Sequence, residues 1–292
     1  MGDFAKRCIF LGAMTHSASI GLGSVLANRY ELVTKIARGD MGDVFEAHDR
    51  VDGSKVAVKV LRAEYLADEP MRRRFRREGA VLKALQHPAI VRLLELGIAE
   101  DGLVFLVTEY VEGETLTERL SRGPLGVAAA DALVDAVCDG LSAAHAHGVL
   151  HGDLKPANVV WPPEGRPRLV DFGASKVLGL DRLTATGEIS GTPAYMAPEM
   201  LTGKADVDQR IDVYGLGVVL YEALSGKRPF QDGHVGRLMM KIDAGDHLPI
   251  DVVADVPDAI ARVVERAMHR IKNDRYADMI ELKKAWHGAR HA

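Results

Sequence analysis

The hydrophobic pattern of this 292-residue chain changes its period partway along. Residues 30–61 form short apolar runs separated by glycines, which is typical of β-strands joined by tight turns. After Gly113 the spacing becomes helical, as in residues 128–147, where apolar side chains recur every three or four positions. Strands first and helices afterwards predict an α+β protein with two lobes, one small and β-rich, the other larger and helical.

The expected elements and boundaries follow from this pattern. Strands are expected at residues 30–36, 44–47, 56–61 and 103–111. Helices are expected at residues 69–86, 128–147, 213–225 and 257–269. We expect a poorly ordered N-terminal extension over 1–28, and one domain over 29–288 made of a small lobe (29–107), a joint (108–113) and a large lobe (114–288).

Composition excludes several classes of protein. The chain has 37 Lys and Arg against 41 Asp and Glu, a net charge of -4, which gives no electrostatic basis for binding nucleic acid. Its two cysteines, Cys8 and Cys138, are too few for a disulfide scaffold and belong to no CxxC pair. A reducing compartment, the cytoplasm, is therefore expected.

The first residues raise the question of a membrane or a leader segment. No charged side chain lies between Cys8 and Ala27, but the apolar run ends at Met14 and polar residues follow. A signal peptide with a cleavage site near Val25 is one interpretation, and the extension described above is the preferred one. Apolar runs elsewhere are too short to span a bilayer, so no membrane span is expected.

Two glycines, Gly39 and Gly42, separate the first two expected strands. Without side chains, backbone N–H groups there can approach an anionic ligand such as phosphate. A simple hairpin with a glycine turn is the favoured interpretation of this segment when it is taken alone.

Lys59 ends a strand with the sequence Val-Ala-Val-Lys, so its amine is expected in a partly buried space. A desolvated ammonium needs a counter-ion, and Glu78 lies on the apolar side of the next helix, with Phe75 and Leu82. We predict that Lys59 pairs with Glu78 and thereby offers a positive charge to a phosphate. A purely structural buried pair is the alternative.

Five arginines surround Phe75 on that helix. Such a run is usually a solvated helix face, and a phosphate-docking site is the weaker alternative. These residues are Arg72, Arg73, Arg74, Arg76 and Arg77.

A dense group of polar residues lies in one expected loop. Asp153 can accept a proton, and Lys155 can neutralise a phosphoryl group in transfer. Asn158 and, farther along, Asp171 offer oxygen ligands for Mg²⁺. The nearby His145, His147 and His151 lack zinc-type partners at the usual spacing and are expected to be packing residues.

These motifs, taken in order, resemble the protein kinases, specifically the bacterial Ser/Thr kinases of eukaryotic type. The resemblance runs from about Tyr30 to Arg275 and includes the glycine turn, Lys59, Glu78 and the 151–158 loop. It also includes Asp171-Phe172-Gly173, the segment Gly191–Glu199 that closes the activation loop, and Asp212 as the anchor of a central helix. Arg275 is similar to the late arginine that pairs with the glutamate at Glu199.

The resemblance implies a bilobal kinase fold and a role for each matched residue. The implied catalytic group is Lys59, Glu78, Asp153, Lys155, Asn158 and Thr192, the last bridging Asp153 and Lys155. The implied Mg²⁺ ligands are Asn158 and Asp171. The implied contacts of ATP are Ile36, Ala37, Gly39, Gly42, Val44, Ala57, Lys59, Thr108, Glu109, Val111 and Asp171.

The sequence departs from the family pattern at two positions. Ala37 stands where the first loop glycine is usual, which is a mild change. Gly152 replaces the usual arginine, so the cation that normally binds a phosphorylated activation loop is missing. We therefore predict that phosphorylation of the loop is not required for activity.

Two other functions share part of this pattern. The catalytic loops of aminoglycoside and choline phosphotransferases also resemble residues 151–158, but Lys155 and the 191–199 segment favour a peptide substrate. A nucleotide-binding scaffold without activity is the second alternative, and it is disfavoured because no catalytic position is missing. The expected function is an ATP- and Mg²⁺-dependent kinase of Ser and Thr residues in proteins, including its own.

Overall fold

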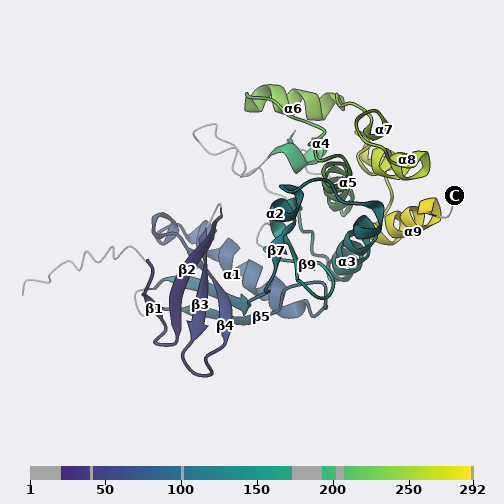
Figure 1. The fold of residues 1–292 in the computed structure, drawn as a ribbon. Helices are drawn as coiled ribbons and strands as arrows, with labels where there is room; N and C mark the ends of the chain where they lie inside the picture. The colour runs from purple at the N-terminus through teal and green to yellow at the C-terminus, as the bar shows by residue number, and fades with distance from the viewer. Residues whose placement is uncertain (1–20, 40–41, 100–101, 173–192, 202–206, 291–292) are drawn as a thin grey trace, which may run out of the picture.

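The computed structural model describes residues 21–39, 42–99, 102–172, 193–201 and 207–290. They form two lobes that lie side by side, one rich in strands and one rich in helices (Figure 1). The predicted α+β class and the predicted order of strands before helices are therefore confirmed.

The small lobe contains one antiparallel sheet with the strand order β1-β2-β3-β4-β6-β5. Hairpins join β2 to β3 and β3 to β4, as the glycine turns predicted, and Gly53 in the second hairpin has a φ of 75°, a conformation that favours glycine. The strands are β1 (Val25–Leu26), β2 (Tyr30–Arg38), β3 (Gly42–Asp49), β4 (Lys55–Leu61), β5 (Leu93–Ile98) and β6 (Val104–Glu109).

The sheet curls until strands from its two ends meet. The Tyr30 hydroxyl on β2 donates a hydrogen bond of 2.6 Å to Glu95 on β5. The Arg29 guanidinium donates to the same carboxylate at 3.3 Å and to Asp49 at 2.6 Å. Because β2 and β5 are distant in the strand order, these bonds close the sheet around an apolar core that includes Phe105.

Helix α1 (Glu69–Ala84) follows the short 3-10 turn η1 (Ala63–Tyr65) and packs on β5 and β6. Its start is capped by Asp68, whose side chain accepts the Met71 N–H at 3.0 Å. The apolar side of the helix buries Phe75 and Leu82, and Glu78 is buried on the same side. The helix therefore carries a carboxylate toward β4.

The large lobe consists mainly of helices around one core. The helices are α2 (Leu116–Leu120), α3 (Val127–Ala146), α4 (Pro198–Leu201), α5 (Arg210–Ser225), α6 (Val235–Ala244), α7 (Ile250–Val253), α8 (Asp258–Ala267) and α9 (Met279–Arg290). A small antiparallel sheet has the strands β7 (Glu114–Thr115), β8 (Val159–Trp161) and β9 (Arg168–Leu169). The 3-10 turns are η2 (Pro156–Asn158), η4 (Pro193–Tyr195) and η5 (Lys272–Asp274).

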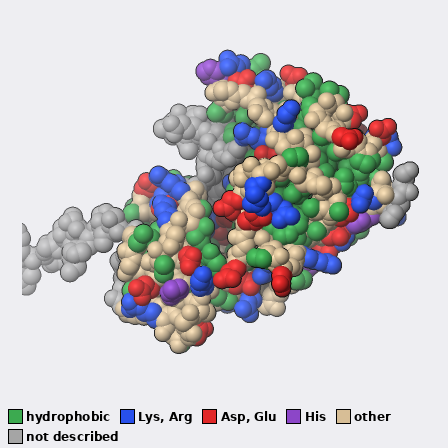
Figure 2. Space-filling view, viewed as in Figure 1, with side chains coloured by type: hydrophobic (Ala, Val, Ile, Leu, Met, Phe, Trp, Pro, Cys, Tyr) green, Lys and Arg blue, Asp and Glu red, His purple; other side chains and the backbone are tan. Residues whose placement is uncertain are grey.

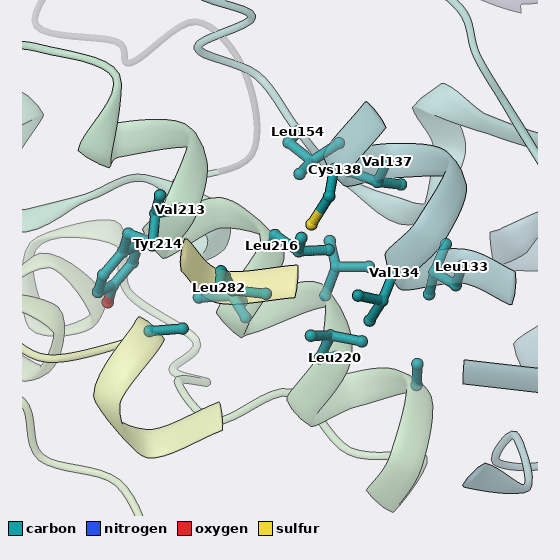
Figure 3. Packing of buried hydrophobic residues seen from close by; sticks show 14 of the residues in the cluster. Leu133, Val134, Val137, Cys138, Leu154, Val213, Tyr214, Leu216, Leu220 and Leu282 are labelled. Carbon is teal, nitrogen blue, oxygen red and sulfur yellow. The ribbon is translucent and has the colours of Figure 1, made fainter. Parts of the chain in front are cut away.

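Helix α5 runs through the centre of this lobe and is buried on nearly all sides, as its apolar sequence requires. Figure 3 shows Val134 and Val137 of α3 packed beside Leu216 and Leu220 of α5. Leu154, from the loop before η2, points into the same core. The core thus holds the middle of the 151–158 loop.

Two elements differ from the sequence-based expectations. Strand β1 lies within residues 1–28, which we expected to be a poorly ordered extension, yet Leu26 is buried and pairs with Tyr30. Residues 21–28 are thus part of the sheet edge. Strand β5 (Leu-Leu-Glu-Leu-Gly-Ile) was not expected, because its sequence pattern does not match its burial. Its apolar side chains, Leu94, Leu96 and Ile98, lie on the more exposed face, and the other face includes Glu95 and Gly97.

Positively and negatively charged side chains are mixed on the surface. Blue and red side chains are interspersed over both lobes on the face drawn in Figure 2, in keeping with the small net charge. Within the described ranges, no helix is long and apolar enough to cross a membrane.

Candidate active site

The amine of Lys59 lies where three segments of the chain meet. Its Nζ atom donates to Glu78 Oε1 on α1 at 2.8 Å and to Asp171 Oδ1, just after β9, at 2.6 Å. The Lys59 side chain is 12% exposed and that of Glu78 is 2% exposed. Strand alternation explains the direction: Lys59 points away from the buried faces of its neighbours Val58 and Val60.

Burial and charge oppose each other in this cluster. Burial is the largest influence on both groups, and alone it would lower the pKa of Lys59 and raise the pKa of Asp171. The facing charges outweigh it, so the pKa of Lys59 lies above its usual value and the pKa of Asp171 lies below its usual value. The Lys59 ammonium and the Asp171 carboxylate are therefore both charged at neutral pH.

A buried carboxylate on α5 holds the loop that follows α3. Asp212 is 1% exposed, and it accepts the backbone N–H of His151 at 2.9 Å and that of Gly152 at 2.7 Å. His145 Nε2 lies 2.7 Å from the same carboxylate. Burial, the largest effect, would raise the pKa of Asp212, but the His145 bond and the neighbouring donors hold that pKa below its usual range.

Asp153 and Lys155 flank the buried Leu154, so their side chains leave the core on the other side of the chain. Lys155 Nζ donates to Asp153 Oδ2 at 2.7 Å, and both side chains are partly exposed. The Asn158 amide nitrogen donates to the Asp153 carbonyl at 2.9 Å. A carboxylate and an ammonium therefore stand together at the surface of a firmly anchored loop.

Asp171 has a left-handed backbone conformation, with a φ of 59°. Such a conformation costs roughly 1–2 kcal/mol for a residue with a side chain, and strain of this kind gathers at functional sites. The Val170 N–H donates to the Asn158 carbonyl at 3.0 Å, so Asp171 follows a segment that runs beside η2. The structure thus brings together Asn158 and Asp171, which the sequence placed thirteen positions apart.

The donor atoms of this pair fit Mg²⁺. Since the Asn158 amide nitrogen is used by the Asp153 carbonyl, the amide oxygen and the Asp171 carboxylate are the available hard ligands. Across the described residues, no three His, Cys, Asp or Glu side chains gather into a metal cage. Mg²⁺ commonly uses one or two protein ligands and completes its shell with water and phosphate oxygens.

The three histidines near the loop have separate partners. His145 bonds to Asp212, and His147 Nδ1 lies 2.9 Å from the Ala143 carbonyl. His151 Nδ1 accepts the Asp153 N–H at 3.3 Å, and its ring packs on Phe172. Burial lowers the pKa of His151, so its ring is neutral at neutral pH.

The glycine turn is a close approach between strands. The Gly39 N–H donates to the Gly42 carbonyl at 2.9 Å, and a Cβ atom on Gly42 would lie 2.4 Å from the Val60 carbonyl oxygen. Arg62, the residue after β4, donates to the Gly39 carbonyl at 3.2 Å. Sequence reasoning missed this arginine, because nothing in its neighbourhood marks it as a partner of the turn.

The side chains expected to surround ATP lie on neighbouring strands. Ala37 and Val44 are register partners across β2 and β3, and Ala57 and Thr108 are register partners across β4 and β6. Ile36 is exposed on β2. Glu109 and Val111 belong to the segment that joins the lobes.

The residues expected from the activation segment are described only in part. Thr192 lies outside the described residues, and so do Gly173 of the Asp-Phe-Gly motif and Gly191 of the segment that closes the activation loop. Glu199 and Arg275 form a bidentate ion pair, with both nitrogen–oxygen distances at 2.8 Å. This pair, implied by the sequence resemblance, ties α4 to the segment after η5.

Comparisons with known proteins agree with one another. The family model described as "Protein kinase domain" matches residues 30–286. Among curated proteins, the serine/threonine-protein kinase PknA of Mycobacterium tuberculosis is 38% identical over 273 residues, which cover 90% of this chain and 63% of PknA. A probable serine/threonine-protein kinase PknB of Lactococcus lactis is 32% identical over 267 residues, covering 90% of this chain and 42% of that protein.

Among solved structures, the kinase domain of M. tuberculosis PknI superposes with a TM-score of 0.74 at 29% identity. The match covers 94% of this chain and 100% of that domain. The chain spans less than two thirds of the length of the two curated relatives named above.

Proposed function

We propose that this chain, which belongs to the protein kinase family, transfers the γ-phosphoryl group of ATP to Ser and Thr hydroxyls of proteins. The observation that carries the proposal is the contact of Lys59 with both Glu78 and Asp171. In this contact Lys59 is the proposed phosphate-binding cation, Glu78 on α1 positions it, and Asp171 is the proposed metal ligand. The names of the relatives support Ser and Thr as acceptors.

In the proposed reaction each residue has one task. Lys59, held by Glu78, binds the α- and β-phosphates. The acceptor oxygen bonds to the γ-phosphorus while the bond from that phosphorus to the β-phosphate oxygen breaks, and the hydroxyl proton passes to Asp153. Lys155, 2.7 Å from Asp153, neutralises the charge that develops on the phosphoryl group.

Mg²⁺ would be held by Asn158 and Asp171, and when bound it neutralises phosphate charge. Adenine would lie between the strands that carry Val44 and Ala57 and the joining segment, Glu109 to Val111. Thr192 would bridge Asp153 and Lys155. A kinase that uses ATP and has few cysteines fits the cytoplasm, which is where we propose that it works.

The substrate class is tested by offering rival acceptors to the purified chain with γ-labelled ATP and Mg²⁺. We expect phosphoserine and phosphothreonine on a generic acceptor protein and on the chain itself, with none after chelation of the metal. Label on kanamycin or choline, and none on protein, would make the chain a small-molecule kinase. Binding of ATP without any transfer would make it a scaffold. Lys59→Ala and Asp171→Ala serve as inactive controls.

A further inference from the structure

Arg168 connects three segments that are far apart in the sequence. It begins β9, and its Nη2 atom donates to the Ile90 carbonyl, in the loop after α1, at 3.0 Å. The same atom donates to Glu109 Oε1 at 2.5 Å. Glu109 ends β6, where the chain passes from the small lobe to the large one.

Glu109 has a second partner, Arg92, which bonds to the same carboxylate oxygen. Its carboxylate accepts the Arg92 N–H at 2.7 Å, and its own N–H donates to the Arg92 carbonyl at 3.0 Å. Burial, the largest influence, would raise the pKa of Glu109, but the Arg168 and Arg92 donors hold that pKa below its usual value. The bond between Arg168 and Glu109 is thus charge-assisted and only partly shielded, since the two side chains are 23% and 26% exposed.

From Arg168 the chain passes through the end of β9 to the proposed metal ligands. The Leu169 N–H donates to the Ala89 carbonyl at 2.7 Å, and the Leu169 carbonyl accepts the Val91 N–H at 2.9 Å. The next residue bonds to Asn158, and the one after it is Asp171. The short path from Arg168 to both metal ligands is therefore hydrogen-bonded along its length.

We infer that Arg168 and Glu109 form a clamp between the lobes that sets the distance from the adenine-binding segment to Asn158 and Asp171. The inference rests on the proposed function, because it assigns one end of ATP to residues 108–111 and the other to the metal ligands. Arg168 is a positioning residue: it acts through Glu109 and β9 and touches no reacting group. A displacement of about 1 Å at such a site can cost on the order of a hundredfold in rate.

The test compares a ligand that spans the clamp with one that does not. Adenosine reaches only the joining segment, whereas the non-hydrolysable analogue AMP-PNP with Mg²⁺ reaches both ends. By calorimetric titration, Arg168→Gln should weaken AMP-PNP·Mg²⁺ about tenfold, roughly 1.4 kcal/mol, and leave adenosine within about twofold. Equal loss for both ligands would mean that Arg168 acts only on the joining segment, and no loss for either would remove its role; both overturn the clamp.

Matched variants separate the clamp from general stability. Glu109→Gln keeps the backbone near adenine and should reproduce the Arg168→Gln pattern, and the double variant should lose no more than either single one. Additive losses would overturn the inference, as would a lowered melting temperature with both affinities normal. Lys55→Gln removes exposed pairs with Glu112 and Glu46, each at 3.7 Å, and should change neither affinity.

Binding of AMP-PNP·Mg²⁺ by the wild-type chain tests the proposed function separately from the clamp. If it fails to bind AMP-PNP·Mg²⁺, the ATP-dependent function fails before the clamp is considered. If it binds and Arg168→Gln binds equally well, the clamp alone fails.

Discussion

Replacing Asp212 by Asn should destabilise the whole chain and weaken catalysis together. The carboxylate has one oxygen facing the Gly152 N–H and the other facing the His151 N–H and His145. Asparagine keeps the shape but offers one oxygen and one NH₂ group. Whichever way the amide turns, its NH₂ group faces at least one buried donor that the aspartate satisfied.

The magnitude follows from the number of bonds changed. A buried N–H that loses its acceptor costs about 1–3 kcal/mol, and the bonds that survive lose charge assistance worth about 1 kcal/mol more. We expect the free energy of unfolding of Asp212→Asn to fall by about 2–4 kcal/mol, which lowers the melting temperature on the order of 5–10 °C. Gly152 precedes Asp153, so kcat should fall as well.

The assay is a thermal melt across pH, with Asp139→Asn as a control. Because the folded-state pKa of Asp212 is lowered, its contribution is present above the ordinary pKa near 3.9 and is lost as pH falls through the folded pKa. The gap between wild type and variant should be present at pH 7 and narrow below about pH 4. Asp139 forms a half-exposed pair with Lys283 and should cost less than about 1 kcal/mol. Equal losses in the two variants, or a gap within 2 °C at pH 7 — about the size expected from 1 kcal/mol — would refute this reasoning.

Two further outcomes are expected. Glu78→Gln should raise KM for ATP about tenfold, roughly 1.4 kcal/mol, with little change in melting temperature; a large loss of melting temperature with normal kinetics would instead make its pair with Lys59 purely structural. Alanine at three hydroxyl residues outside the described ranges should leave activity within several-fold of wild type, since Gly152 offers no cation for a phosphate, and a fall of about a hundredfold, some 2.7 kcal/mol, would contradict this. Those residues are Thr184, Thr186 and Ser190.

Most of the fold that could be predicted from the sequence followed from the local spacing of apolar residues. The Val-Ala-Val-Lys run became part of β4, and the apolar spacing of residues 69–86 became α1, because each element buries one face of its own sequence. The partner of Lys59 on α1 was predictable for the same reason: a buried Glu78 and a buried Lys59 each require an opposite charge.

Contacts between distant segments were not predictable in this way. The bond from Lys59 to Asp171 spans 112 positions, and the bond from Arg168 to Glu109 spans 59. An arginine at the start of a two-residue strand has the same local sequence signal as any surface arginine. His145 was expected only to pack at a helix end, and its bond to Asp212 depends on how α3 lies against α5.

The central claim is that Asp153 receives the proton of a protein hydroxyl during phosphoryl transfer. The most direct measurement is kcat/KM for phosphorylation of an acceptor protein by wild type and by Asp153→Ala, with AMP-PNP binding and melting temperature as controls. We predict a loss of about 10²–10⁴-fold in kcat/KM, with nucleotide affinity and melting temperature retained. Transfer by Asp153→Ala at close to the wild-type rate would contradict the claim.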